Sequence, residues 1–156
     1  MEKVGKFKKI DKDKFIDQKA YDSIQLPKRA TIGSAGYDFF APYDFTIEPK
    51  SSFTVHSGIK CKIKGGWVLM VHGRSSLGIK GLRLNTTVGI IDSDYYSNPQ
   101  NDGEIGLGLV NTTDKRFEFK AGDRLAQGIF VPYGITTDDD VTDTRVGGFG
   151  STGKWL

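Results

Sequence analysis

The chain has 156 residues, which suits one domain with a real core. It has no apolar run near the roughly 20 residues of a membrane-spanning helix, and its net charge of +3 is too small to favour duplex nucleic acid, although it suits a polyanionic ligand. A single cysteine excludes an internal disulfide and a cysteine zinc cluster, and the N-terminus lacks the apolar core of a secretory signal, so we expect a cytoplasmic protein.

The predicted elements, taken in chain order, are short β-strands almost throughout, after an N-terminal segment over residues 1–27. From residue 53 apolar side chains alternate with polar ones, which places Cys61 on the apolar face and Lys60 on the polar face of a strand. Residues 67–71 are apolar throughout and predict a strand buried on both faces, and a helical turn is expected at 75–80. Alternation then predicts further strands at residues 105–109 and 117–119, and residues 124–133 are another candidate strand.

Glycine-rich turns separate these strands, since the chain contains 20 glycines. Many short strands with turns between them are typical of an all-β sandwich or barrel, not of an α/β sheet. We expect the β core over residues 28–135 of a single domain. Residues 136–156 (TTDDDVTDTRVGGFGSTGKWL) are polar and glycine-rich, and this composition predicts a mobile C-terminal arm.

One acid stands where the next residue of a buried strand would be expected. Asp92 directly follows the apolar run 88–91 (VGII), in a stretch that also holds Asp94 and two tyrosines. A hairpin with a solvated tip is the simple interpretation. The alternative is a carboxylate that a rigid apolar strand holds at the rim of a pocket, where it could orient a water molecule.

Four other stretches carry glycines, hydroxyls and charges in patterns that suit a nucleotide. They are SAGYDFFAP (34–42), HGRSSLG (72–78), AGDRLAQ (121–127) and RVGGFGSTG (145–153). Taken singly, each can be an ordinary turn. Together they supply backbone N–H groups and hydroxyls for phosphate oxygens, arginines that clamp phosphates, carboxylates for Mg²⁺ and an aromatic ring for a base. This inventory suits a nucleoside triphosphate with a magnesium ion and a water.

In order and spacing, the five stretches resemble the five motifs of the trimeric dUTPase family. The matching segments are AGYDFFAP, GRSSLG, VGIIDSDY, GDRLAQ and GGFGSTG, within a match from about residue 28 to residue 154. Extra residues between Tyr95 and Gly103, here called the 96–102 insertion, are similar to the phage and Firmicute branch of that family. The resemblance implies a jelly-roll-like distorted β-barrel, assembled as a homotrimer with composite active sites.

The resemblance also implies hydrolysis of dUTP to dUMP and pyrophosphate with Mg²⁺ as cofactor. Asp92 would activate the attacking water, and Tyr95 would lie under the deoxyribose and leave no room for a 2′-hydroxyl. Asp38 would act on Mg²⁺ through waters. Uracil would meet the backbone of a tight hairpin pocket and an aromatic ring. The implied substrate-binding residues are Arg74, Ser75, Ser76, Thr86, Gly89, Ile90, Ile91, Tyr95, Gln127, Arg145, Phe149, Gly150, Ser151 and Thr152.

Three details of the implied site depend on spacing. Many family members place an asparagine for uracil at the position that Thr86 holds here, whereas Asn85 stands one residue earlier. On a strand these two side chains would face opposite ways, so a uracil contact from Asn85 requires a bulge. Arg145 stands one residue closer to Phe149 than in many members, which leaves its geometry toward the phosphates open. The arm beginning near Thr144 is expected to close over a site built by other chains.

Two alternatives have signals of their own. A dCTP deaminase shares the implied fold and a GRSSL stretch, but its glutamate would fall at Gly108, which has no side chain to activate water at the pyrimidine. A regulatory protein-binding role is the other alternative, with the 96–102 insertion as the contact surface. His56 and His72 have no evident partner in the sequence and are assigned no chemical role.

Overall fold

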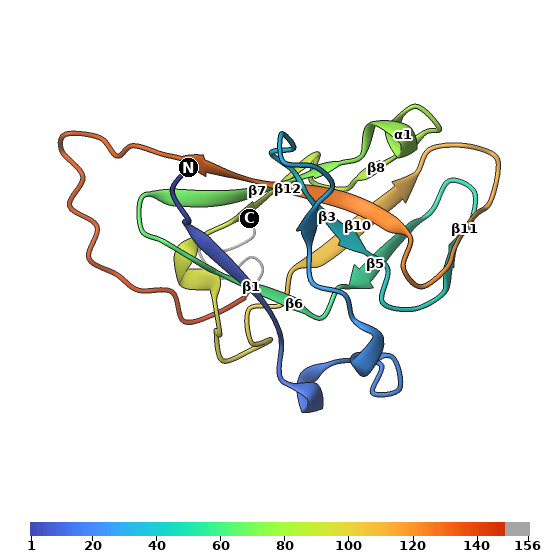
Figure 1. The fold of residues 1–156 in the computed structure, drawn as a ribbon, viewed down its shortest axis with the longest axis horizontal. Helices are drawn as coiled ribbons and strands as arrows, with labels where there is room; N and C mark the ends of the chain where they lie inside the picture. Colours follow the sequence, from blue (N-terminus) through green and yellow to red (C-terminus); the bar gives the residue numbers. More distant parts are fainter. Residues whose placement is uncertain (149–156) are drawn as a thin grey trace, which may run out of the picture.

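The computed structural model describes residues 1–148, and nearly all of its regular structure is β-strand (Figure 1). The strands are β1 (Gly5–Lys9), β2 (Lys28–Arg29), β3 (Tyr37–Phe40), β4 (Phe45–Ile47), β5 (Ser52–His56), β6 (Ile59–Ile63), β7 (Trp67–Gly73), β8 (Leu82–Leu84), β9 (Val88–Ile91), β10 (Gly106–Asn111), β11 (Phe117–Phe119) and β12 (Arg124–Pro132). The helical elements are α1 (Ser75–Gly78) and the 3-10 turns η1 (Lys12–Lys14), η2 (Tyr21–Ser23) and η3 (Ser93–Tyr95). Within residues 1–148, no helix has the length and hydropathy needed to cross a membrane. The all-β prediction is confirmed, and the expected helical turn is α1.

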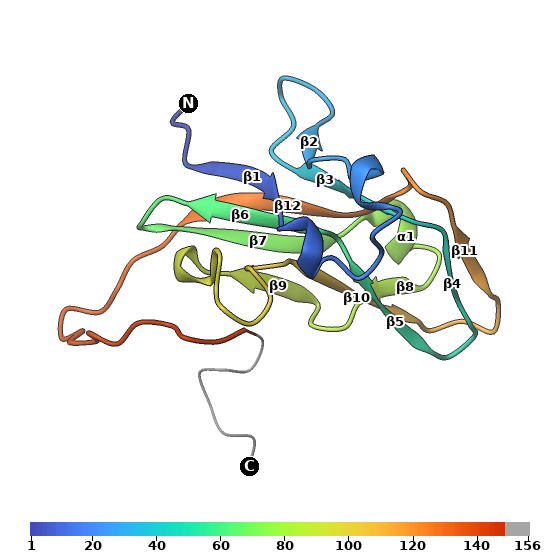
Figure 2. The ribbon, with the colours of Figure 1, turned by 90° about the horizontal axis from the view of Figure 1, so that it is seen from below.

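Antiparallel pairing joins these strands into a distorted barrel. A five-stranded sheet has the order β2-β3-β12-β7-β9, and a three-stranded sheet has the order β5-β10-β8. The pairs β1-β6 and β4-β11 complete the arrangement. Figures 1 and 2 show β12 and β7 side by side through the centre of the molecule, with β1 and β6 along one side and the arm after β12 swinging out and back. This agrees with the jelly-roll-like barrel that the sequence predicts.

Buried apolar side chains from both larger sheets form the core. Leu69 and Val71 of β7 are buried, whereas Val68 and Met70 on its other face are only partly covered, so the predicted burial of this strand on both faces is wrong for the isolated chain. Burial raises the pKa of Cys61 to about 12, which keeps its thiol protonated as a small apolar group. The fully buried apolar side chains include Phe39, Val55, Leu69, Leu107, Leu109 and Leu125.

The N-terminal segment is part of this barrel. β1 pairs antiparallel with β6, with Phe7 opposite Cys61. Ile10, Phe15 and Ile24 belong to the buried core, and the ring of Phe7 packs edge-on against Phe39 at 5.7 Å between centroids. Apolar burial therefore extends before residue 28, where the sequence alone placed the start of the core.

The 96–102 insertion covers Lys60 on the polar face of β6, whereas Lys62 on that face stays exposed. Lys60 is only 7% exposed, and its ammonium lies 2.7 Å from the carboxylate of Asp102, which also accepts a hydrogen bond from the backbone N–H of Asp11. Burial alone would raise the pKa of Asp102, but the hydrogen bonds from Lys60 and Asp11, with the charge of Lys60, outweigh burial and lower that pKa. A buried ion pair therefore fastens the insertion to the barrel.

Asp102→Asn should lower the free energy of unfolding by about 3–5 kcal/mol, because it leaves the Lys60 ammonium buried without a counter-charge. Since folding lowers the pKa of Asp102, its contribution is present above the ordinary carboxyl pKa of about 4 and is lost as the pH falls through the lowered value. Thermal unfolding should therefore show a lower Tm for the variant than for wild type at neutral pH, and this difference in Tm should become smaller in acid. Asp114→Asn, which removes an exposed partner of Lys50, should leave unfolding nearly unchanged. An equal difference in Tm at neutral and acidic pH would contradict the role given to the charge of Asp102.

Candidate functional site

A pocket of about 360 Å³ opens between the turn that joins β8 to β9 and the start of β10. Gly89, Ile90 and Ile91 lie along its wall, opposite residues 105–108. This turn links two sheets, since β8 pairs with β10 and β9 pairs with β7, so the expected hairpin is not formed. The turn is tight, because Thr87 has a φ of 60° and the backbone N–H of Val88 donates to the carbonyl of Thr86 at 2.6 Å. Wider hollows lie beside Tyr43 and beside Lys80, away from the acid that follows β9.

Asn85 and Thr86 both line this pocket. Residues 85–87 form the turn between β8 and β9, so the strand alternation that separated these two side chains does not apply. The backbone N–H of Asn85 donates to the carbonyl of Gly108 at 2.9 Å, and a Cβ on Gly108 would come 2.8 Å from the Asn85 amide nitrogen. The Asn85 side chain therefore occupies the space that a side chain at position 108 would need.

Asp92 stands directly beyond the pocket, at the end of β9. Ile91 is 5% exposed and pairs with Leu69 of β7, so the strand that carries the acid is anchored in the core. The Asp92 side chain is about half exposed, and its carboxylate accepts a hydrogen bond from the Arg145 guanidinium at 2.7 Å. Arg145 also donates through Nε to Asp94 at 3.0 Å. The described part of the arm thus contacts the Asp92 carboxylate of its own chain.

Tyr95 is fixed beside this acid by two hydrogen bonds. Its hydroxyl donates to the carbonyl of Glu104 and accepts from the side-chain amide of Asn101, both at 2.7 Å. Burial is the main cause that raises the pKa of Tyr95, so the hydroxyl keeps its proton at neutral pH. The Arg145 guanidinium carbon lies 5.9 Å from the centre of the Tyr95 ring, within the range of a cation–π contact.

A second cluster gathers most of the residues assigned to the phosphates. Gln127 of β12 pairs with Asp38 of β3 on one side and with His72 of β7 on the other. The Asp38 carboxylate lies 3.3 Å from Nε of Arg74, and Arg74 leads directly into Ser75 and Ser76 of α1. Within residues 1–148, no three acidic, histidine or cysteine side chains are grouped to bind a metal ion directly.

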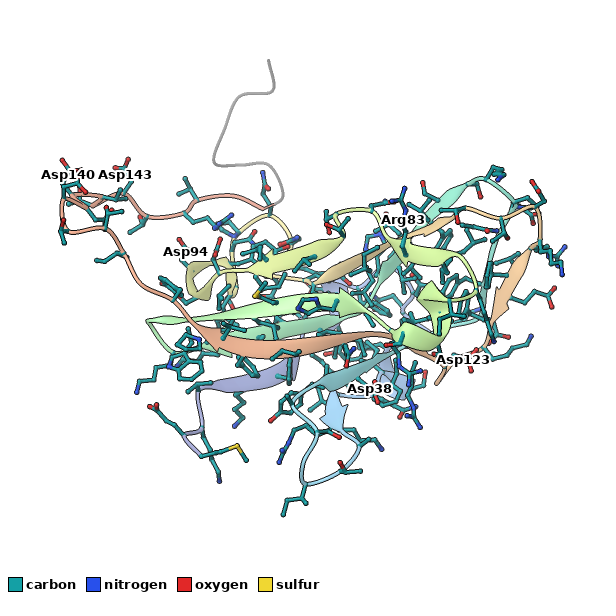
Figure 3. The ribbon with its side chains drawn as sticks, turned by 90° about the horizontal axis from the view of Figure 1, so that it is seen from above. Asp38, Arg83, Asp94, Asp123, Asp140 and Asp143 are labelled. Carbon is teal, nitrogen blue, oxygen red and sulfur yellow. The ribbon has the colours of Figure 1, made fainter. Side chains whose placement is uncertain are left out.

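The two clusters do not meet within one chain. In the five-stranded sheet, β12 and β7 lie between β3, which carries Asp38, and β9, which leads into Asp92. His72 pairs with both Gln127 and Val88, so Val88 lies in register with Asp38 across the sheet. Asp92 lies four residues beyond Val88 along the chain. These offsets separate the two carboxylates by roughly 20 Å. Figure 3 shows Asp38 and Asp94, the neighbour of Asp92, on opposite sides of β7 and β12.

Some of the expected site lies outside the described residues. Phe149, Gly150, Ser151 and Thr152 all fall in residues 149–156. Of the arm residues assigned to the substrate, Arg145 is the one described. The expectation that the arm closes over another chain's site stays a prediction.

Sequence reasoning missed two polar contacts near the site. Arg124, at the start of β12, lies 3.5 Å from the second oxygen of Asp38, so two arginines flank this carboxylate. His56 also has a partner, which corrects the expectation that it has none: its Nδ1 lies 3.0 Å from the buried carboxylate of Glu104. Arg124 lies within the stretch AGDRLAQ and could have been noticed, whereas nothing in the sequence links His56 to Glu104.

Comparisons with known proteins agree on one family. The dUTPase family model matches residues 22–153. The chain is 40% identical to the deoxyuridine 5'-triphosphate nucleotidohydrolase of Lactococcus lactis over 133 residues, which covers 83% of this chain and 89% of the relative. The protein with the same name in Histophilus somni is 38% identical over 156 residues and covers 94% of this chain and 99% of the relative.

Solved structures show the same similarity. The dUTPase from Streptococcus mutans has a TM-score of 0.72 and 37% identity, covering 83% of this chain and 97% of that chain. The dUTPase from phage phi11 of S. aureus has a TM-score of 0.68 over 92% of this chain and 99% of that chain, and at 19% identity it shows a common fold.

Proposed function

Since this chain belongs to the dUTPase family, we propose that it hydrolyses dUTP to dUMP and pyrophosphate. The pocket beside β9 carries the proposal most directly. Its wall is largely backbone and apolar side chains, and an acid follows at its rim. A pocket with this lining suits a flat pyrimidine without a 5-methyl group. The amide groups of such a base can exchange hydrogen bonds with the backbone of the wall.

Asp92 is the proposed general base. A water held by its carboxylate would lose a proton to Asp92 while attacking the α-phosphorus, and the bond to pyrophosphate would break. The buried Ile91 supports this role, because an anchored strand aims the carboxylate with little rotational freedom. Arg145, which holds Asp92 in the isolated chain, is proposed to turn toward the terminal phosphates when substrate binds.

Uracil and deoxyribose are proposed to lie on the side of the site formed by β9 and the turn before it. Gly89 to Ile91 would offer backbone groups to the base, with Asn85 or Thr86 at the mouth of the pocket. Tyr95 would pack under the sugar, where a 2′-hydroxyl would collide with its fixed ring. The arm residues Phe149, Gly150, Ser151 and Thr152 are proposed to cover the bound nucleotide.

The phosphates are proposed to meet the second cluster. Arg74, Ser75, Ser76 and Gln127 offer a guanidinium, two hydroxyls and an amide to phosphate oxygens. The Asp38 carboxylate, flanked by arginines, fits a Mg²⁺ ion held through waters. Bound Mg²⁺ supplies charge neutralisation on the triphosphate, which lowers its repulsion of the nucleophile.

A composite site between chains follows from these assignments. The base at Asp92 must act on a phosphate that Arg74 grips, yet the two clusters are separated by roughly 20 Å in one chain. A second copy can bring its phosphate cluster to the Asp92 of the first. We therefore propose a homo-oligomer, specifically the homotrimer that the family resemblance implies, in the cytoplasm.

The two alternatives gain less support. A deaminase would need a glutamate where Gly108 stands, and the Asn85 side chain fills that space. For a regulatory protein partner, the 96–102 insertion offers a small surface, because its exposed residues are Ser97, Pro99 and Gln100. Hydrolysis of dUTP is therefore the proposed function.

A nucleotide panel tests this proposal. With Mg²⁺ present, dUTP should release pyrophosphate at least about 100-fold faster than dTTP, dCTP or UTP. The pocket wall along β9 should reject an altered base, and Tyr95 should reject the added 2′-hydroxyl. Chelation of the metal should stop release, and added Mg²⁺ should restore it. Ammonia from dCTP would assign the chain to deamination instead.

A further inference from the structure

The 96–102 insertion contacts the tyrosine proposed to face the sugar. Asn101 donates through its amide nitrogen to the Tyr95 hydroxyl at 2.7 Å. Its amide oxygen accepts from the Asn98 side chain at 2.6 Å and from the backbone N–H of Gly103 at 3.1 Å. Because both polar atoms of its side-chain amide form hydrogen bonds, Asn101 is held in one orientation. Its hydrogen bond to the Tyr95 hydroxyl in turn holds the Tyr95 side chain in place.

The same insertion contacts the arm. The backbone N–H of Gly148 donates to the Gln100 side-chain oxygen at 2.7 Å. A Cβ on Gly148 would come 3.0 Å from that oxygen and 3.5 Å from the Asn101 amide nitrogen, so the arm lies directly on these two side chains. Gly148 immediately precedes the glycine- and hydroxyl-rich segment that is proposed to cover the nucleotide.

The insertion is rigid enough to serve as an anchor. Asn98 and Asp102 are 4% and 5% exposed, and the ion pair between Lys60 and Asp102 fixes the insertion to β6. Gln100 itself is exposed, so a segment that arrives from solvent can reach it. An exposed acceptor on a fixed base suits the docking of the arm at Gly148.

We propose that Gln100 and Asn101 are positioning residues for dUTP hydrolysis: Gln100 anchors the arm at Gly148, and Asn101 holds Tyr95 against the sugar. This rests on the proposed function, because it assigns the insertion to the same site. Anchoring at Gln100 reduces the chain entropy that the arm loses when it closes, so it strengthens substrate binding. Fixing Tyr95 keeps the space for a 2′-hydroxyl closed, so it sharpens selection of the sugar.

Gln100→Ala tests the anchor. Loss of one hydrogen bond to the arm should raise KM for dUTP about 3- to 10-fold and leave kcat within about twofold. Gln100→Glu keeps an acceptor oxygen and should restore the wild-type KM. Gln18→Ala removes a glutamine from the N-terminal segment and should match wild type throughout.

Limited trypsin digestion measures the anchor without catalysis. In ligand-free protein, cleavage after Arg145, which is 14% exposed, should be about 3- to 10-fold faster in Gln100→Ala than in wild type or Gln100→Glu. Equal cleavage and equal KM would overturn the anchoring role even if dUTP hydrolysis stands. If wild type does not hydrolyse dUTP, the proposed function fails, while the digestion still decides whether Gln100 holds the arm.

Asn101→Asp tests the contact to Tyr95. The substitution keeps the oxygen that Asn98 and Gly103 need but removes the donor to the Tyr95 hydroxyl. The ratio of kcat/KM for dUTP to that for UTP should fall about 3- to 10-fold, whereas Gln100→Ala should leave this ratio unchanged. An unchanged ratio in Asn101→Asp, with Tm close to wild type, would remove Asn101 from the proposal.

Discussion

Asp92→Asn should reduce turnover of dUTP by at least about 100-fold and leave dUTP binding largely intact. The amide has nearly the shape of the carboxylate but cannot accept the proton of the attacking water. The anchored end of β9 should hold the new side chain where the old one was, because Ile91 stays buried. Single-turnover kinetics would measure the chemical step, and titration with a non-hydrolysable dUTP analogue would measure binding.

Asp94→Asn is the matched control for this experiment. Both acids contact the Arg145 guanidinium, at 2.7 Å for Asp92 and 3.0 Å for Asp94, so both substitutions weaken the hold on the arm. Only Asp92 directly follows the strand that lines the pocket. We therefore expect Asp94→Asn to lower turnover by less than about tenfold. Near-normal turnover in Asp92→Asn with a large loss in Asp94→Asn would move the base to Asp94.

The pattern of apolar residues predicted about half of the strands. It located β5 to β7 and β10 to β12 because apolar side chains recur there at every second residue or in an unbroken run. It did not locate β1, whose sequence GKFKK has a single apolar residue. Pairing with β6 and the packing of Phe7 make that segment a strand, and neither contact is visible in a local pattern.

The local parts of the candidate site were also visible in the sequence. The pocket wall, the acid and Tyr95 come from one contiguous stretch, so their order along the chain already brings them together. Contacts between distant segments were not predictable from one sequence. The ion pair of Lys60 and Asp102 spans 42 positions, and the hydrogen-bond contact of His56 with Glu104 spans 48. Asn85 reached the pocket because a turn replaced the expected strand.

Separation of the two clusters has a direct experimental consequence. Arg74 grips the Asp38 carboxylate at one end of the sheet, and Asp92 stands roughly 20 Å away in the same chain. A variant that lacks either residue should be nearly inactive, because one loses the base and the other loses a phosphate clamp. If each site takes Asp92 from one chain and Arg74 from another, the two defects can be separated by mixing.

Mixed oligomers of Asp92→Asn and Arg74→Ala should therefore regain activity that neither variant has alone. Sites that combine the intact Asp92 of one chain with the intact Arg74 of another would form about a quarter of all sites in a random equimolar mixture. Co-refolding of differently tagged chains, followed by purification on both tags, would yield oligomers known to be mixed. A site built within one chain could never recover, since every chain carries one of the two defects. Absence of any regained pyrophosphate release in such oligomers would place Asp92 and Arg74 in the same chain's site, and the sheet would then have to rearrange to bring them together.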